Sequence, residues 1–101
     1  MNRVSFISSI DGIAYPRMIV DFFDHFLALK QIIEDTGEKI NISSKTDRSI
    51  SFEIDFNNNL SLINAMHTIG CLTNGIINIY NRPISVFPEV LTDKKLRITL
   101  S

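Results

Sequence analysis

The sequence predicts one α+β domain in which two helices cover one face of an antiparallel sheet. Two observations favour this fold class. Apolar residues recur at helical spacing in two segments, whereas several other segments alternate between apolar and polar residues as strands do. The chain has 101 residues, 45% of them apolar, which provides for one hydrophobic core. We therefore expect a single domain over residues 1–101.

The first strand and the first helix are expected before residue 36. A β-prone run at residues 4–9 ends at the turn signal Asp11-Gly12, and Pro16 then suits the first turn of a helix. From there the apolar residues share one helix face, which predicts a continuous helix over residues 16–35. That face consists of Ile19, Phe22, Phe23, Phe26, Leu29 and Ile33.

A hairpin is expected next, with a strand at residues 40–42 and another at residues 50–56. The turn between them is predicted at Thr46-Asp47-Arg48. In the longer strand, apolar residues alternate strictly with polar ones. Because its second face is wholly polar, the sheet should be covered on one side only.

A second helix follows, and either Asn58 or Asn59 is expected to cap its N-terminus. The sequence Asn74-Gly75 indicates where it ends. The residues expected to face inward are Leu62, Ile63, Met66, Ile69 and Gly70.

Two strands are expected to close the chain. The first covers residues 76–80, with an extension through Pro83 to Phe87, and its prolines restrict it to a sheet edge or a break. The last is predicted from the alternation of Leu96, Ile98 and Leu100 with Lys95, Arg97 and Thr99. The resulting order, βαββαβ with an extra C-terminal strand, is the ferredoxin-like arrangement. This fold hosts many functions, so it does not by itself decide the activity.

Composition excludes several classes of function. Ten basic and eleven acidic side chains give a net charge of −1, which disfavours a general nucleic-acid binder. The most apolar stretch, residues 18–33, contains charged residues that a membrane-spanning helix would not tolerate. The N-terminus lacks the pattern of a secretion signal, and Cys71 is the single cysteine. We expect a cytoplasmic protein that contacts neither nucleic acid nor a membrane.

Residues that could carry catalysis are few. His67 and Cys71 have the spacing at which two side chains on one helix face can hold a metal, but no second pair accompanies them. His25 lies beside Asp24, where an exposed surface histidine is the simpler interpretation. The sequence contains no nucleophile elbow and no phosphate-binding glycine loop. We therefore expect no enzyme activity, no metal and no cofactor.

Charged residues on the expected sheet suggest a binding role instead. Glu53 and Asp55 share the polar face of their strand and could contact a basic partner, although such pairs also simply keep a sheet face soluble. They stand where an RNA-recognition sheet carries aromatic rings, which argues against RNA binding. The cluster Lys94-Lys95 with Arg97 is either a solvated strand end or a patch that meets these acids from another subunit.

Residues 39–69 resemble an ACT regulatory domain, most closely those of aspartate kinases. The similar segments are Lys39-Ile40-Asn41-Ile42-Ser43-Ser44, Arg48-Ser49-Ile50-Ser51-Phe52-Glu53-Ile54-Asp55 and the helix with Ala65-Met66-His67. The resemblance implies a module that pairs with a second copy and binds an amino acid at the interface, near the loop after the first strand. That loop corresponds here to Asp11, Gly12, Ile13 and Ala14, which Asn41, Ile42 and Ser43 would face. The family's usual Pro-Gly is replaced by Pro16-Arg17.

Two functions are therefore expected from the sequence. The first is a non-catalytic, ACT-like regulatory module that works as a homodimer and binds an amino acid. The alternative is a dedicated protein-binding chain, such as an inhibitor, an antitoxin or a toxin-immunity protein of bacterial or phage origin. In either case, the strand bearing Asn41, Ser43 and Ser44, and the final strand, are candidate edges for pairing in a homodimer.

Overall fold

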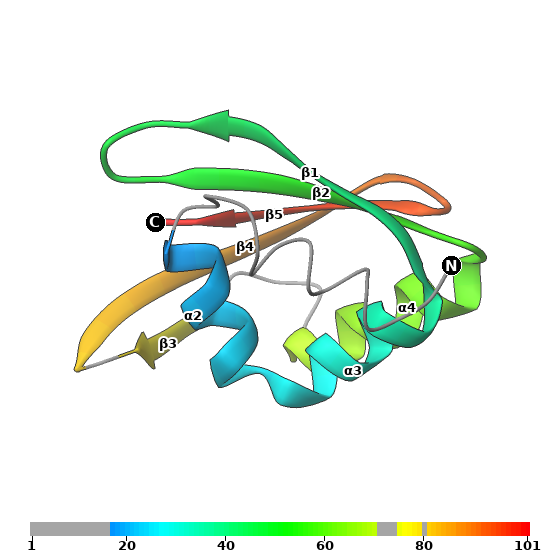
Figure 1. Ribbon diagram of the computed structural model, residues 1–101, viewed down its shortest axis with the longest axis horizontal. Coiled ribbons are helices and arrows are strands. Elements are labelled where there is room, and N and C mark those ends of the chain that lie inside the picture. Colours follow the sequence, from blue (N-terminus) through cyan, green and yellow to red (C-terminus); the bar gives the residue numbers. More distant parts are fainter. Residues whose placement is uncertain (1–16, 71–74, 80) are drawn as a thin grey trace.

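The computed structural model describes residues 17–70, 75–79 and 81–101 (Figure 1). The expected strand at residues 4–9 lies outside these residues. Along the chain the elements are α2 (Arg17–His25), α3 (Leu27–Thr36), β1 (Gly37–Lys45), β2 (Ile50–Phe56), α4 (Asn59–Ile69), β3 (Gly75–Ile79), β4 (Arg82–Thr92) and β5 (Lys95–Leu100). None of the described helices is both long and apolar enough to cross a membrane.

The strands form one sheet in the order β1-β2-β5-β4-β3, and every neighbouring pair is antiparallel. The α+β class is thus confirmed, but the strand order differs from that of a simple ferredoxin-like sheet. One reason is that residues 76–87 do not form a single strand. Asn81, with a φ of 62°, lies where the chain turns back, and β3 pairs with β4 as a hairpin.

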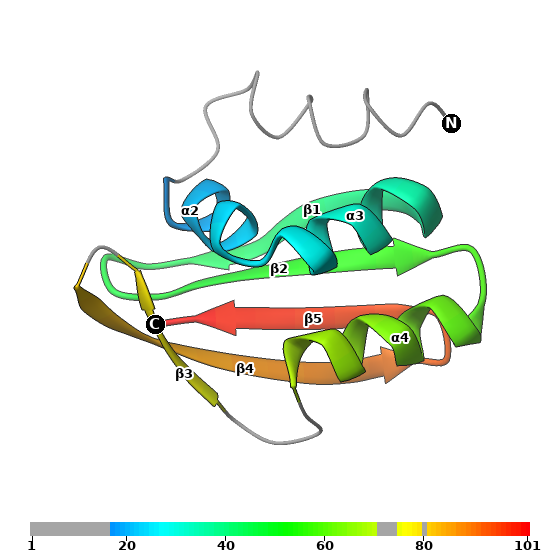
Figure 2. The same cartoon turned by 90° about the horizontal axis from the view of Figure 1, so that it is seen from below.

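One face of the sheet carries the helices. Figure 2 shows α2, α3 and α4 in front of the sheet, and the edge view in Figure 1 shows all three on the same side. The rings of Phe22 and Phe23 pack against Phe52 of β2, with centroids 6.0 and 5.7 Å apart. Leu96, Ile98 and Leu100 of β5 are fully buried in the same core. The apolar face predicted for the first helix therefore packs on the apolar side of the sheet.

The first helix bends where a continuous helix was expected. Phe26 has a φ of −106° and a ψ of 71°, which separates α2 from α3. Backbone hydrogen bonds continue across the bend, from the Phe26 N–H to the Phe22 carbonyl at 3.0 Å and from the Lys30 N–H to the Phe26 carbonyl at 2.9 Å. Neither glycine nor proline occurs at the bend. The usual sequence signals of a kink are therefore missing here.

Helix α4 begins at the expected cap. The Ser61 N–H donates to Oδ1 of Asn58 at 2.9 Å, so Asn58 and not Asn59 is the cap. The Asn59 side chain instead donates to the Asp93 carbonyl at 2.7 Å. The helix ends at Ile69, earlier than predicted, because Gly70 adopts a left-handed φ of 93° that terminates it.

The last strand is central rather than peripheral. β5 pairs with β2 on one side and with β4 on the other, so the expectation that it offers a free edge for a dimer is wrong. β1 pairs only with β2 among the described strands. The pairing of β3 with β4 ends at Val86. Pro88 lies beyond it, where, within the described residues, β4 pairs with β5 on one side only, in agreement with the expected edge position.

Candidate functional site

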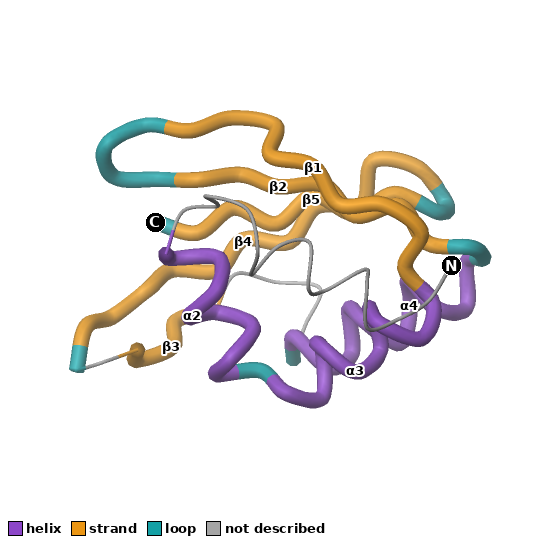
Figure 3. The backbone as a smooth tube through the Cα atoms, in the orientation of Figure 1, coloured by secondary structure: helices purple, strands orange, loops and turns teal. Residues whose placement is uncertain are grey.

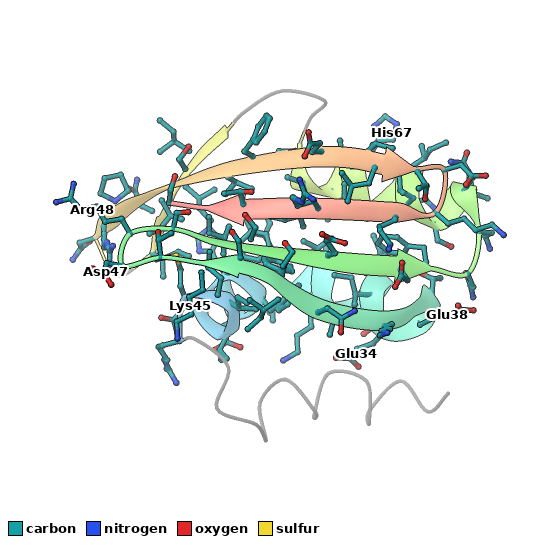
Figure 4. All side chains as sticks on the ribbon, turned by 90° about the horizontal axis from the view of Figure 1, so that it is seen from above. Glu34, Glu38, Lys45, Asp47, Arg48 and His67 are labelled. Atoms are coloured by element: carbon teal, nitrogen blue, oxygen red, sulfur yellow. The ribbon has the colours of Figure 1, made fainter. Side chains whose placement is uncertain are left out.

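The sheet face opposite the helices is the candidate site, and Figure 4 looks onto it. Within the described residues, no helix covers this side (Figures 1 and 3). Side chains reach it from alternate positions of four adjacent strands because successive residues of a strand point to opposite sides. We call this set the open face: Lys39, Asn41 and Ser44 of β1, Ser51, Glu53 and Asp55 of β2, Phe87 and Glu89 of β4, and Lys95, Arg97 and Thr99 of β5.

Strand register arranges the open face in three rows across the sheet. The first row runs Asn41, Glu53, Arg97, Glu89. The second runs Lys39, Asp55, Lys95, and the third runs Ser44, Ser51, Thr99, Phe87. Acidic residues of β2 therefore lie beside basic residues of β5 in two consecutive rows.

Five of these side chains form a charge network within one chain. Arg97 contacts Glu53 at 3.3 Å through Nη2 and Glu89 at 3.1 Å through Nη1. Lys95 Nζ lies 3.7 Å from Asp55 and 3.9 Å from Glu53. The basic residues thus already meet the acids in the same sheet. The sequence also allowed these basic residues to meet the acids of another subunit. Such contacts would be made in addition to those within the chain.

The charge network is partly shielded from water. The exposed fraction of the side chains ranges from 21% for Glu53 to 45% for Glu89. Ion pairs this exposed contribute about 0.2–1 kcal/mol each, so the network orients its charges more than it stabilises the fold. The Arg97 Nε is buried and has no hydrogen-bond partner among the described residues. Its guanidinium is therefore held through the two terminal nitrogens.

A hollow of about 360 Å³, lined mainly by polar residues and one phenyl ring, lies on the open face. Its hydroxyl groups include Ser51 Oγ and Thr99 Oγ1, which are 2.7 Å apart in a hydrogen bond across β2 and β5. The phenyl ring of Phe87, 45% exposed, forms part of its wall. The complete lining is Ser43, Ser44, Ser51, Phe87, Glu89, Arg97 and Thr99.

The structure describes three of the ligand residues that the resemblance implied, and they lie on neighbouring positions of β1. Asp11, Gly12, Ile13 and Ala14 lie outside the described residues. Asn41 lies on the open face opposite Glu53, and Ser43 lines the hollow at a register shift in β1. Ile42, however, pairs with Phe52 and therefore belongs to the helix-covered side, where it is 36% exposed. Asn41, Ile42 and Ser43 therefore do not share one side of the sheet.

Sequence reasoning missed two members of the site, Phe87 and Glu89. They alternate along β4 with the buried Val86 and Pro88, and this period of two was the available signal. Their proximity to Arg97 depends on the pairing of β4 with β5.

The remaining candidates for chemistry lie away from the open face. His67 is exposed on α4, at an apolar groove of about 530 Å³ between that helix and Val90 of β4. Cys71 lies outside the described residues. The His25 ring packs edge-on against Phe26, with centroids 5.2 Å apart. In the described part of the chain, no three His, Cys, Asp or Glu side chains lie close enough to hold a metal ion.

Comparison with protein-family models, with curated proteins and with solved structures found no match to this chain.

The hydroxyl pair of the hollow can be tested by a double-mutant cycle. We expect Ser51→Ala and Thr99→Val each to lower the free energy of unfolding by about 1 kcal/mol, because each removes the same partly buried hydrogen bond. The double variant should lose clearly less than the sum of the two. Urea unfolding of dilute protein measures all three. Ser44→Ala is the exposed control, and additive losses would contradict the pairing.

Proposed function

We propose that this chain is a protein-binding module that works through the open face. One observation carries the proposal: all the described helices lie on one side of the sheet, and the other side presents ordered charges beside an exposed phenyl ring. Aromatic anchors next to oriented charges are typical of protein interfaces. If the partner is a different protein, occupying it is the action of an inhibitor, an antitoxin or an immunity protein.

The charge network prepares the open face for binding. Glu53, Asp55, Lys95 and Arg97 are already oriented by their mutual contacts, so few side-chain rotamers remain to be fixed on association. Phe87 contributes apolar area that a partner would remove from water. The alternating charges give the approaching partner a preferred orientation.

The edge of β1 is less suited to binding than the open face. Its pairing with β2 has two register shifts, one between Gly37 and Lys39 and one between Ile42 and Ser44. Bulges and lysines on a sheet edge oppose the addition of another strand, and β1 carries both. We therefore assign binding to the face of the sheet.

Photo-crosslinking tests this proposal without knowledge of the partner. A photoreactive phenylalanine analogue is placed at Phe87, and in a control chain at Leu60, which is 66% exposed on α4. After irradiation of cells that naturally make the chain, we expect an adduct with another polypeptide from position 87 and none from position 60. Equal adducts at both positions, or none at position 87, would contradict the proposal.

A second candidate function is amino-acid binding. The resemblance to ACT domains implies such a ligand near residues 11–14, whereas we propose the hollow as its site. The hollow joins an acidic side chain, Glu89, to the hydroxyls of Ser51 and Thr99. A free α-amino acid offers matching groups, because its ammonium would pair with the carboxylate and its carboxylate would accept hydrogen bonds from the hydroxyls. This ligand would place Ser43, which lines the hollow, in its binding site.

A melting-temperature screen against the common amino acids tests this second function. If one binds, it should raise the melting temperature by about 10–20 °C at about 100 times its dissociation constant, since binding to the folded state adds about 2.7 kcal/mol. The shift should disappear in Thr99→Val and persist in the Leu60→Ala control on α4. Unchanged melting with every amino acid would exclude the function.

A further inference from the structure

We infer that the open face binds a second copy of this chain, face to face, about a two-fold axis that runs along the strands between β2 and β5. The inference rests on the proposed function, because it names the partner of the same surface. Its evidence is the strand register, which makes the charge pattern of the open face complementary to itself.

The central strands supply the charge complementarity. The axis runs parallel to the strands, midway between β2 and β5. Rotation by 180° about it places β5 of the second copy over β2 of the first, and β2 of the second copy over β5 of the first. Glu53 pairs in register with Arg97, and Asp55 with Lys95. After the rotation, Glu53 therefore faces Arg97 of the partner subunit, and Asp55 faces Lys95 of the partner subunit. Each contact occurs twice, with opposite charges in every case.

The flanking strands match as well. The same rotation lays β1 over β4 of the second copy, because these strands flank the central pair. Asn41 then faces Glu89 of the partner subunit, whose carboxylate can accept a hydrogen bond from the Asn41 amide. Ser44 faces Phe87 of the partner subunit, so the exposed ring is covered by a small side chain. No like charges lie opposite each other in these rows.

Other positions of the axis give poorer matches. An axis on β5 would place Arg97 opposite Arg97 of the partner subunit, and Glu53 opposite Glu89 of the partner subunit. An axis on β2 would place Glu53 opposite Glu53 of the partner subunit. Between β5 and β4, the axis would pair Arg97 with Glu89 but would leave both acids of β2 without a basic residue opposite. Like charges opposite each other oppose association, so the register favours the axis between β2 and β5.

Partial burial in the single chain lowers the dehydration cost of this arrangement. Glu53 is 21% exposed, Asp55 32%, and Lys95 and Arg97 38% each, so part of their dehydration has already occurred on folding. Each charge keeps its neighbours of opposite sign in the sheet and gains one more across the axis, and this attraction opposes the dehydration cost that remains. Sheets that pack face to face keep their strands within about 30° of each other, so rows near the axis stay opposite.

A charge-swap experiment tests the dimer. Wild-type chain should sediment as a dimer at micromolar concentration. Glu53→Lys and Arg97→Glu should each weaken self-association by at least about tenfold, because each sets like charges opposite each other across the axis. An equimolar mixture should restore dimers, since Lys at position 53 of one chain then faces Glu at position 97 of the other. Glu34→Lys on α3, on the helix side of the sheet, is the charge-matched control and should leave the dimer intact.

The outcomes separate the two proposals. Circular dichroism establishes that each variant folds, and Glu53→Gln with Arg97→Gln replaces the reversals if either variant does not fold. A wild-type monomer, or a mixture that does not recover dimers, would overturn the second copy as partner. If the wild-type chain is a monomer, a photo-crosslink from position 87 to a polypeptide of different mass would still support the proposed function. A dimer unaffected by either reversal would overturn this use of the open face.

Discussion

The two central strands of the sheet, β2 and β5, alternate strictly between apolar and polar side chains. Their pairing puts Phe52 opposite Ile98 on one side, and Glu53 opposite Arg97 on the other. The aromatic residues of α2 can be buried only on the apolar side, so the helices lie there. The charged side chains of the other side are favoured in contact with water, and none of the described helices covers them (Figure 2). The core and the candidate site are therefore two consequences of one alternation.

Local signals in the sequence predicted much of this arrangement. The period of two identified residues 50–56 and the final strand, and both are found with apolar residues buried on one side. The Asn58 cap depends on a side chain and a backbone N–H three residues apart, so it too could be read locally. The turn at residues 46–48 lies between β1 and β2 as expected.

Three other features were not predicted, either because no sequence signal marks them or because they depend on distant parts of the chain. No proline or glycine marks the bend at Phe26. The Phe26 ring packs on the ring of Phe22, with centroids 5.1 Å apart. The turn at Asn81 divides the expected fourth strand and changes the order of the sheet. Glu89 joins Arg97 only because β4 pairs with β5, so the full charge network requires the register. Glu53 and Asp55 were found from sequence because they lie on one strand.

In the single chain, one side of the sheet is a packed core and the other faces water. Equilibrium unfolding of Phe52→Ala and Phe87→Ala tests it most directly, since the same change is made on each side, in protein dilute enough to be monomeric. Phe52 is fully buried and Phe87 is 45% exposed. Phe52→Ala should lower the free energy of unfolding by about 3–5 kcal/mol, and Phe87→Ala by less than about 1 kcal/mol. Equal losses at the two positions would show that the two sides of the sheet are equally buried.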